Sequence, residues 1–358
     1  MNGEFRQRVS FILAASTAAT LIVLLAWSAR IILLLLFAGL IGALLLSILI
    51  DSIQALLKLR RSLAFSLVLA SLVLFLGLGI WMRGPAIAQQ FSDLQVDLPS
   101  AMHKVLTRMR AETWGQWLLS HYSDAGQLAS GAQYLLARIG GAVLTTASTI
   151  AGLYVIVAIS IYVAAEPASY LHLFDSITPA EYRGTLARCL TGAAQLLRSW
   201  LLAKLIAMIT IGTFIALGLW ILQVPLAGTL GLIAALLTFV PNLGPVLSVV
   251  PAALLAFAVS PAKGILTVLL FAAAHFLEGS IVMPLLERKI VSLPPALTLT
   301  AQLLLASVAG PIGVVLAAPL TAAGLGILQA FQGERPHTVA FRTRLRAYSS
   351  TPPQQTPV

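Results

Sequence analysis

Residues 224–260 read VPLAGTLGLIAALLTFVPNLGPVLSVVPAALLAFAVS, which is two apolar arms separated by a break rich in proline and glycine. The break is Pro241-Asn242-Leu243-Gly244-Pro245, and neither proline has a backbone N–H to donate within a helix. Each arm has about 15 residues, which reach about 22 Å as a helix, whereas the hydrocarbon core of a bilayer is ~30 Å thick. The arms therefore predict a re-entrant hairpin or a pair of half-helices, although two tightly connected short spans would give the same pattern.

A second break of the same kind interrupts the apolar residues 296–331. It consists of Gly310-Pro311-Ile312-Gly313, and Pro319 follows it as Pro251 follows the first break. Broken helices on either side of one continuous span are typical of transporters built from repeats, where the freed backbone groups line a cavity. The candidate solute-contacting residues are therefore Pro241, Asn242, Gly244, Pro245, Gly310, Pro311 and Gly313. Two surface loops between ordinary spans are the alternative interpretation.

The composition of the chain indicates that lipid is its solvent. Of its 358 residues, 59% are hydrophobic and 9% are charged, whereas soluble domains have about 25% charged residues. The net charge is +10, but no basic run is interleaved with stacking aromatic residues, so we expect no nucleic-acid partner. The sequence predicts an all-α polytopic membrane protein with two broken, re-entrant regions. Its uninterrupted apolar stretches are 11–29, 31–50, 62–82, 141–165, 205–222 and 264–286.

The distribution of Lys and Arg predicts the topology and the organisation of the chain. Short connections rich in these residues face the cytoplasm, which places both termini inside the cell. Thr178-Pro179-Ala180-Glu181 has the pattern of a capping box that starts an interfacial helix, with packing against the bundle as the alternative. Pro99-Ser100 predicts a break within an external segment. The expected parts are N-terminal spans (1–83), an extracytoplasmic helical segment (84–140), a span (141–165), a cytoplasmic interfacial helix (166–203), a transport core with both breaks (204–332) and a partly disordered cytoplasmic tail (333–358).

Glu278 is the most informative single residue because it lies well inside an apolar stretch. An ionisable group at membrane depth costs at least about 2.5 kcal/mol unless it faces a cavity or a partner, so a functional role is the first hypothesis. His275 lies three residues earlier, on the same helical face. Together they are candidates for binding a coupling proton or cation. A glutamate that snorkels to the cytoplasm, or caps a broken segment before Pro284, is the alternative.

Enzymatic functions have little support in the sequence. The five histidines are scattered, and no His-Glu-x-x-His motif, paired cysteines or Gly-x-Ser-x-Gly motif is present. Cys189 is the only cysteine, so intrachain disulfides are excluded. A phosphate-binding Gly-x-x-x-x-Gly-Lys-Ser/Thr motif is also absent, which argues against ATP drive within this chain. We therefore expect no enzymatic activity, no metal and no cofactor.

Four short motifs, taken together, resemble the autoinducer-2 exporter family, also called PerM-like permeases. They are residues 239–245 (FVPNLGP), residues 275–279 (HFLEG) with Pro284, Leu293-Pro294-Pro295, and residues 310–320 (GPIGVVLAAPL). The resemblance implies a bacterial inner-membrane protein with about eight membrane segments, each broken region counting as one. It also implies export of a small polar molecule, antiport of a cation or proton, and assembly into a homo-oligomer. Pro241, Gly244, Pro245 and Glu278 occupy recurrent positions of the family.

These observations predict a secondary transporter whose site lies between the two broken regions and the Glu278 helix. Its expected partners are membrane lipids, a small-molecule solute and a proton or sodium ion. A non-transporting membrane scaffold, which would bind partners through the external segment and the interfacial helix, is an alternative. A channel is another.

Overall fold

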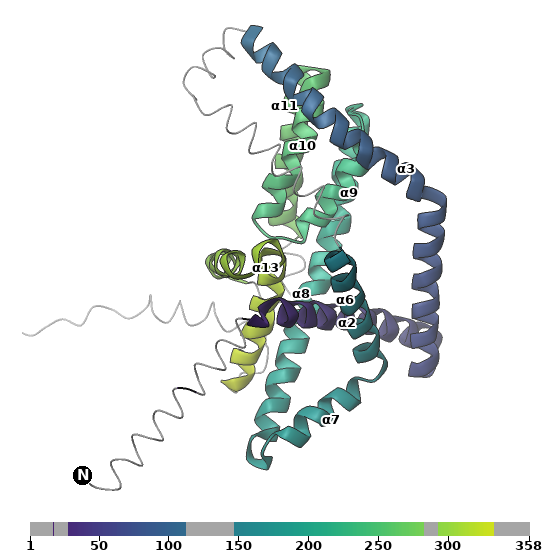
Figure 1. The fold of residues 1–358 in the computed structure, drawn as a ribbon, viewed down its shortest axis with the longest axis vertical. Coiled ribbons are helices and arrows are strands. Elements are labelled where there is room, and N and C mark those ends of the chain that lie inside the picture. Colours follow the sequence, from purple (N-terminus) through teal and green to yellow (C-terminus); the bar gives the residue numbers. More distant parts are fainter. Residues whose placement is uncertain (1–16, 18–27, 112–146, 283–292, 333–358) are drawn as a thin grey trace, which may run out of the picture.

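The computed structural model describes residues 17, 28–111, 147–282 and 293–332, and within them every regular element is helical (Figure 1). This confirms the predicted all-α fold class. The helices are α2 (Arg30–Leu57), α3 (Arg61–Ala111), α6 (Ala147–Ala165), α7 (Pro167–Ile177), α8 (Ala180–Ile221), α9 (Ala227–Thr238), α10 (Leu243–Val259), α11 (Pro261–Leu277), the π-helical turn η1 (Glu278–Val282) and α13 (Pro295–Phe331).

Five helices of the described ranges are long and apolar enough to cross a membrane, or up to six if the bent pair α6–α7 counts as one. They are Arg30–Leu57, Arg61–Gly79, Ala180–Ile221, Pro261–Ile281 and Pro295–Phe331. The predicted stretches 31–50, 62–82 and 205–222 lie within or almost within α2, α3 and α8. The described part of 141–165 is α6, and that of 264–286 falls in α11 and η1. The predicted span 11–29 lies outside the described residues, apart from Thr17, Ser28 and Ala29.

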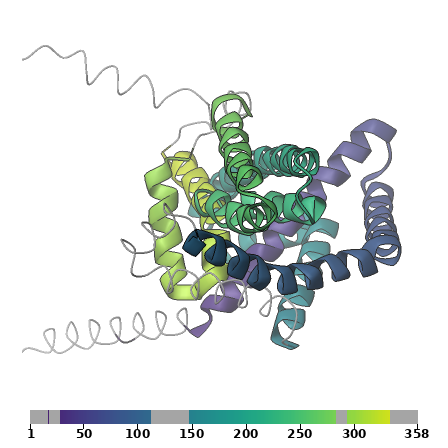
Figure 2. The same ribbon diagram turned by 90° about the horizontal axis from the view of Figure 1, so that it is seen from above.

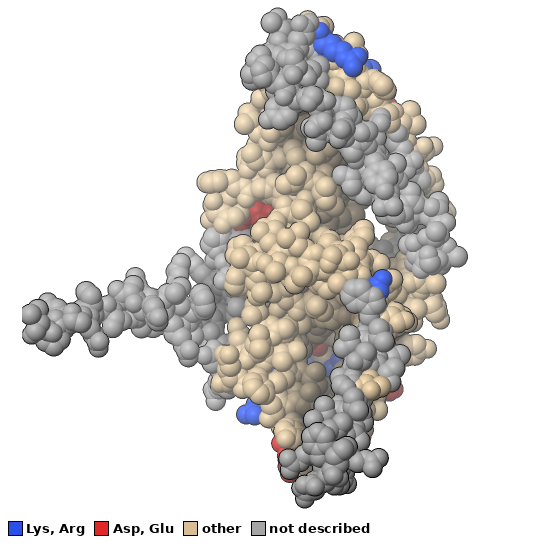
Figure 3. Space-filling view, turned by 60° about the vertical axis from the view of Figure 1, so that its left-hand side comes forward, with Lys and Arg blue, Asp and Glu red and all other residues tan. Residues whose placement is uncertain are grey.

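The outward faces of these helices are apolar, as a lipid environment requires. Figure 3 shows a face that is mostly uncharged, with small separate patches of basic and acidic residues. Large hydrophobic side chains such as Ile209, Leu269 and Leu303 are exposed on three different helices. In water these side chains would be costly to expose, whereas lipid tails solvate them. The chain is a multi-pass membrane protein.

Helix α8 is the centre of the bundle and packs against α9 and α13 over much of its length (Figures 1 and 2). Gly192 on α8 and Gly326 on α13 meet where these helices cross, and a Cβ on either would come within 3.0 Å of the other's carbonyl oxygen. Small residues allow such close approach of helix backbones in membranes. The approach fixes α13 against the same helix that carries one side of the site described below.

The first break forms a tight helical hairpin between α9 and α10. Asn242 has φ 67° and ψ −47°, and the Leu243 N–H donates to the Pro241 carbonyl oxygen at 2.8 Å, which makes Asn242 the centre of a γ-turn. Gly244 is buried at the start of α10, and a Cβ there would lie within 3.0 Å of the Leu237 carbonyl oxygen on α9. At the far end of α10, Ser260 caps α11 by accepting from the Lys263 N–H, and Pro261 occupies the first helical turn. The predicted interruption at 241–245 is therefore a sharp turn between two short helices.

The second break bends α13 at Gly310, whose φ of 61° and ψ of −142° are accessible essentially only to glycine. Residues 311–331 then fold back, so that a Cβ on Gly313 would lie within 3.0 Å of the Leu305 carbonyl oxygen. Gly244-Pro245 and Gly310-Pro311 are the same dipeptide in the two breaks, but Gly313, not Gly310, makes the contact between arms that Gly244 makes in the first. Both broken regions are thus closed by a glycine packed on a carbonyl of the opposing arm.

Two local predictions are wrong. Helix α3 continues through Pro99 to Ala111, because Leu94 and Leu98 before the proline and Ala101 after it pack on the core formed with α9 and α10. The expected capping box does not form either, since the Thr178 hydroxyl donates to the Phe174 carbonyl oxygen instead. Pro179 is the N-cap without a side-chain bond, and α8 then runs without interruption to Ile221.

Candidate functional site

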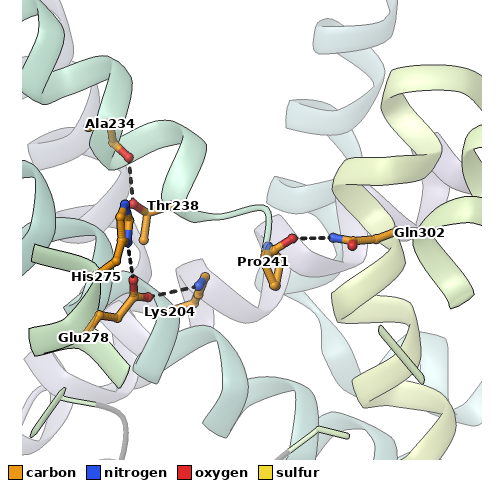
Figure 4. A network of polar contacts seen from close by, with 7 residues as sticks. All are labelled: Lys204, Ala234, Thr238, Pro241, His275, Glu278 and Gln302. Carbon is orange, nitrogen blue, oxygen red and sulfur yellow. Dashed lines mark hydrogen bonds and ion pairs between the residues drawn. The ribbon is translucent and has the colours of Figure 1, made fainter. Parts of the chain in front are cut away.

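Three ionisable side chains meet where α8 faces α11 and η1 (Figure 4). Nζ of Lys204 lies 3.5 Å from Oε1 of Glu278, and Nδ1 of His275 donates to Oε2 of Glu278 at 3.2 Å. The side chains of Lys204 and Glu278 are 6% and 12% exposed, and that of His275 is 21% exposed. The two oxygens of one carboxylate therefore have two different nitrogen partners.

This geometry decides how Glu278 tolerates its apolar surroundings. A snorkelling glutamate would extend its carboxylate towards water, but this one turns inward to Lys204 and His275. Desolvating an isolated carboxylate is very costly, whereas pairing with a cation and a hydrogen-bond donor offsets much of that cost. Glu278 also begins the π-helical turn η1. Such turns are rare and occur frequently at functional sites, where they change the direction of side chains.

Lys204 was not among the residues singled out from the sequence. It lies immediately before the apolar stretch 205–222, where a lysine ordinarily marks the end of a span. In the structure it lies inside α8, one turn beyond the buried Trp200, and is buried itself. Two facts could have identified Lys204 from the sequence. A carboxylate at membrane depth needs a cation, and Lys204 is the only basic residue between 199 and 221.

Gln302 is a second residue that the sequence analysis missed, and it connects the two broken regions. Its Nε2 donates to the Pro241 carbonyl oxygen at 2.8 Å, which ties the first arm of α13 to the turn between α9 and α10 (Figure 4). Gln302 is 2% exposed, and its Oε1 has no hydrogen-bond partner within the described ranges. Nε2 of His275 is also buried without a partner there.

The residues that precede the two breaks pack against one core cluster that includes Trp200 of α8. The ring of Trp200 packs edge-on against Phe239, just before the first break, with centroids 5.6 Å apart. Trp200 belongs to a core cluster that Phe239 and Ala309, which precede the two breaks, both pack against. Lys204, one turn farther along α8, reaches Glu278. The two breaks thus share one core cluster and are linked by Gln302, and α8 connects that cluster to the Lys204–Glu278 pair.

The remaining candidate residues differ in their exposure. Gly244 and Gly313 are buried between hairpin arms, Pro245 and Gly310 are partly buried, and Asn242 and Pro311 are exposed. The Pro245 carbonyl oxygen accepts from the Ser248 hydroxyl at 3.0 Å. The glycines and prolines thus shape the turns, whereas the polar atoms turned inward belong to Gln302, Lys204, His275 and Glu278. No group of three His, Cys, Asp or Glu side chains suited to a metal ion occurs in the described residues.

The sequence profile of the AI-2E family transporter matches residues 13–333, which is most of the chain. The chain is also similar to "Putative transport protein YueF" of Bacillus subtilis, with 23% identity over 313 residues that cover 83% of each protein. A shorter match to "Putative transport protein YrrI" of the same organism is 27% identical and covers 41% of each. A protein of Thermotoga maritima called "Putative transport protein" is 31% identical over 32% of this chain and 36% of its own length. The profile match over the spans, the two hairpins and the Glu278 helix shows that the chain is a membrane transporter of the AI-2E family.

Proposed function

We propose that this protein is a secondary transporter that exports a small polar solute across the bacterial inner membrane by exchange with a proton or a sodium ion. The observation that carries the proposal is the buried carboxylate of Glu278, held between Lys204 and His275 beside two broken regions. Ion coupling requires an ionisable group at membrane depth that can exchange one cationic partner for another. Both termini would face the cytoplasm, and the protein would act as a homo-oligomer.

The solute would bind between the two hairpins. Oε1 of Gln302 and Nε2 of His275 are buried polar atoms without a partner in the described part of the chain, and buried polar atoms normally have one. A solute with hydroxyl groups could donate to both. The backbone groups at 241–245 and 310–313 would complete the site, as they do where broken helices contact a substrate.

Purified protein in detergent provides the first test. Small polar solutes are screened for a shift in melting temperature at several pH values and sodium concentrations, since a ligand that binds only the folded state stabilises it. The solute with the largest shift is then loaded into proteoliposomes. We expect its release to saturate with concentration and to accelerate when an inward proton or sodium gradient is imposed.

The same measurement separates the alternatives. Release that neither saturates nor responds to an ion gradient would support a channel. If no solute shifts the melting temperature and none is released, the transporter proposal fails and a scaffold role gains support. In that case substitutions within 84–140 should weaken the binding of partners more than substitutions at Asn242 or Glu278 do.

A further inference from the structure

We infer that the Lys204 ammonium pairs with the Glu278 carboxylate when no external cation is bound there. One monovalent cation then binds to Glu278 by displacing this ammonium. The inference builds on the coupling role proposed for Glu278 and assigns Lys204 as a positioning and competing group. It also specifies the class of ligand, a monovalent cation rather than a divalent one.

The contact between the two side chains is close enough to neutralise charge and loose enough to be exchanged. The 3.5 Å from Nζ to Oε1 satisfies an ion pair but exceeds the 2.7–2.9 Å of a strong charge-assisted hydrogen bond. A lysine has a flexible four-carbon stem and a single charged nitrogen, so it can withdraw without rearranging its helix. His275 holds the other oxygen, Oε2, from the same helical face. Oε1 is therefore the position at which one cation could replace another.

Charge balance limits what can bind. Helices α9, α10 and α13 contain no charged residue, and the basic groups that contact Glu278 within the described residues are Lys204 and His275. The charges of Lys204 and Glu278 cancel as an ion pair, and an added cation would leave an uncompensated positive charge in the protein interior. When the ammonium withdraws, the negative charge of the Glu278 carboxylate is left without its cation. One proton or one alkali cation restores neutrality, and a divalent cation does not.

The test measures binding of sodium alone to purified protein, independently of any solute. Melting temperatures are recorded in NaCl and in choline chloride at equal ionic strength, across a concentration series that yields an apparent sodium affinity. The variant Lys204→Gln keeps a hydrogen-bond donor and removes the competing charge. We expect its apparent sodium affinity to rise about tenfold or more, in line with coupling energies of close charge pairs.

Lys204→Arg is the matched variant, because it keeps a cation that stays charged and can hold a carboxylate with two parallel bonds. Its sodium response should disappear. Lys204→Gln/Glu278→Gln should also lose the response, which places the sodium at Glu278. An unchanged sodium affinity in Lys204→Gln, or a parental affinity in Lys204→Arg, would overturn the inference. If Lys204→Gln cannot be purified in either salt, the Lys204→Arg result decides alone.

Failure of the inference and failure of the proposed function can be told apart. If gradient-driven flux depends on Glu278 but the apparent sodium affinity does not rise in Lys204→Gln, the proposed transport function stands and the role of Lys204 is rejected. If the apparent sodium affinity rises in Lys204→Gln but gradient-driven flux does not depend on Glu278, the cation site stands and its coupling to transport is rejected.

Discussion

Lys204→Met should destabilise the folded protein by about 3–5 kcal/mol, because the Glu278 carboxylate would stay buried without its cation. Methionine fills the space of the lysine stem with a flexible apolar chain, so lost packing contributes little. The double variant Lys204→Met/Glu278→Gln removes both charges and should recover most of the loss, since the two residues interact directly. Reversible unfolding in mixed micelles with an increasing fraction of SDS measures all three proteins.

The ion pair of Arg198 and Asp51 is the internal control. Its atoms are closer, with Nη1 2.7 Å from Oδ2, but its side chains are 38% and 40% exposed. Exposed pairs contribute about 0–1 kcal/mol, so Arg198→Met should have a much smaller effect. Equal losses for Arg198→Met and Lys204→Met, or a double variant no more stable than Lys204→Met, would show that the buried pair has no special energetic role.

Gly244→Ala should open the first hairpin and lower the yield of folded protein severely. The added Cβ would overlap the backbone carbonyl oxygen of Leu237, which has no side-chain freedom with which to move away. Overpacking usually costs about 1–3 kcal/mol, and a clash with backbone lies at or above the upper end of that range. Gel filtration in detergent and thermal unfolding measure the folded fraction and its stability.

Gly228→Ala is the matched control in the same hairpin. Gly228 lies in α9, and a Cβ there would meet nothing within 4 Å. Alanine is the better helix former, so this variant should be as stable as the parent protein or slightly more stable. A tolerated Gly244→Ala, or equal damage at both positions, would rule out the close contact between α9 and α10 as the feature that requires glycine.

The spans and both interruptions could be predicted because they depend on local chemistry. Long apolar runs satisfy their own backbone as helices, and the missing N–H of Pro241 and the positive φ of Gly310 follow from residue type. Glu278 was also found locally, as a carboxylate within an apolar stretch. The equivalence of Gly313 and Gly244 was not found, because it depends on which arm folds against which carbonyl.

The partners within the site could not be predicted from the sequence. Lys204 and Gln302 lie 74 and 61 residues from Glu278 and Pro241, and only the packing of α8 and α13 brings them together. Lys204 was further obscured by its position at the edge of an apolar stretch. Tertiary packing also overrode two local signals, since Pro99 lies within a continuous helix and Thr178 bonds backward to Phe174.

Coupling through Glu278 is tested most directly by solute release from proteoliposomes, with and without an inward proton or sodium gradient. Three proteins are compared with the parent: Glu278→Gln, the better-balanced Lys204→Met/Glu278→Gln, and Glu181→Gln, which removes an exposed carboxylate at the start of α8. We expect the gradient to accelerate release by the parent and by Glu181→Gln, and to have no effect on the two variants that lack the Glu278 carboxylate. Undiminished gradient-driven release by folded Glu278→Gln would contradict the proposal.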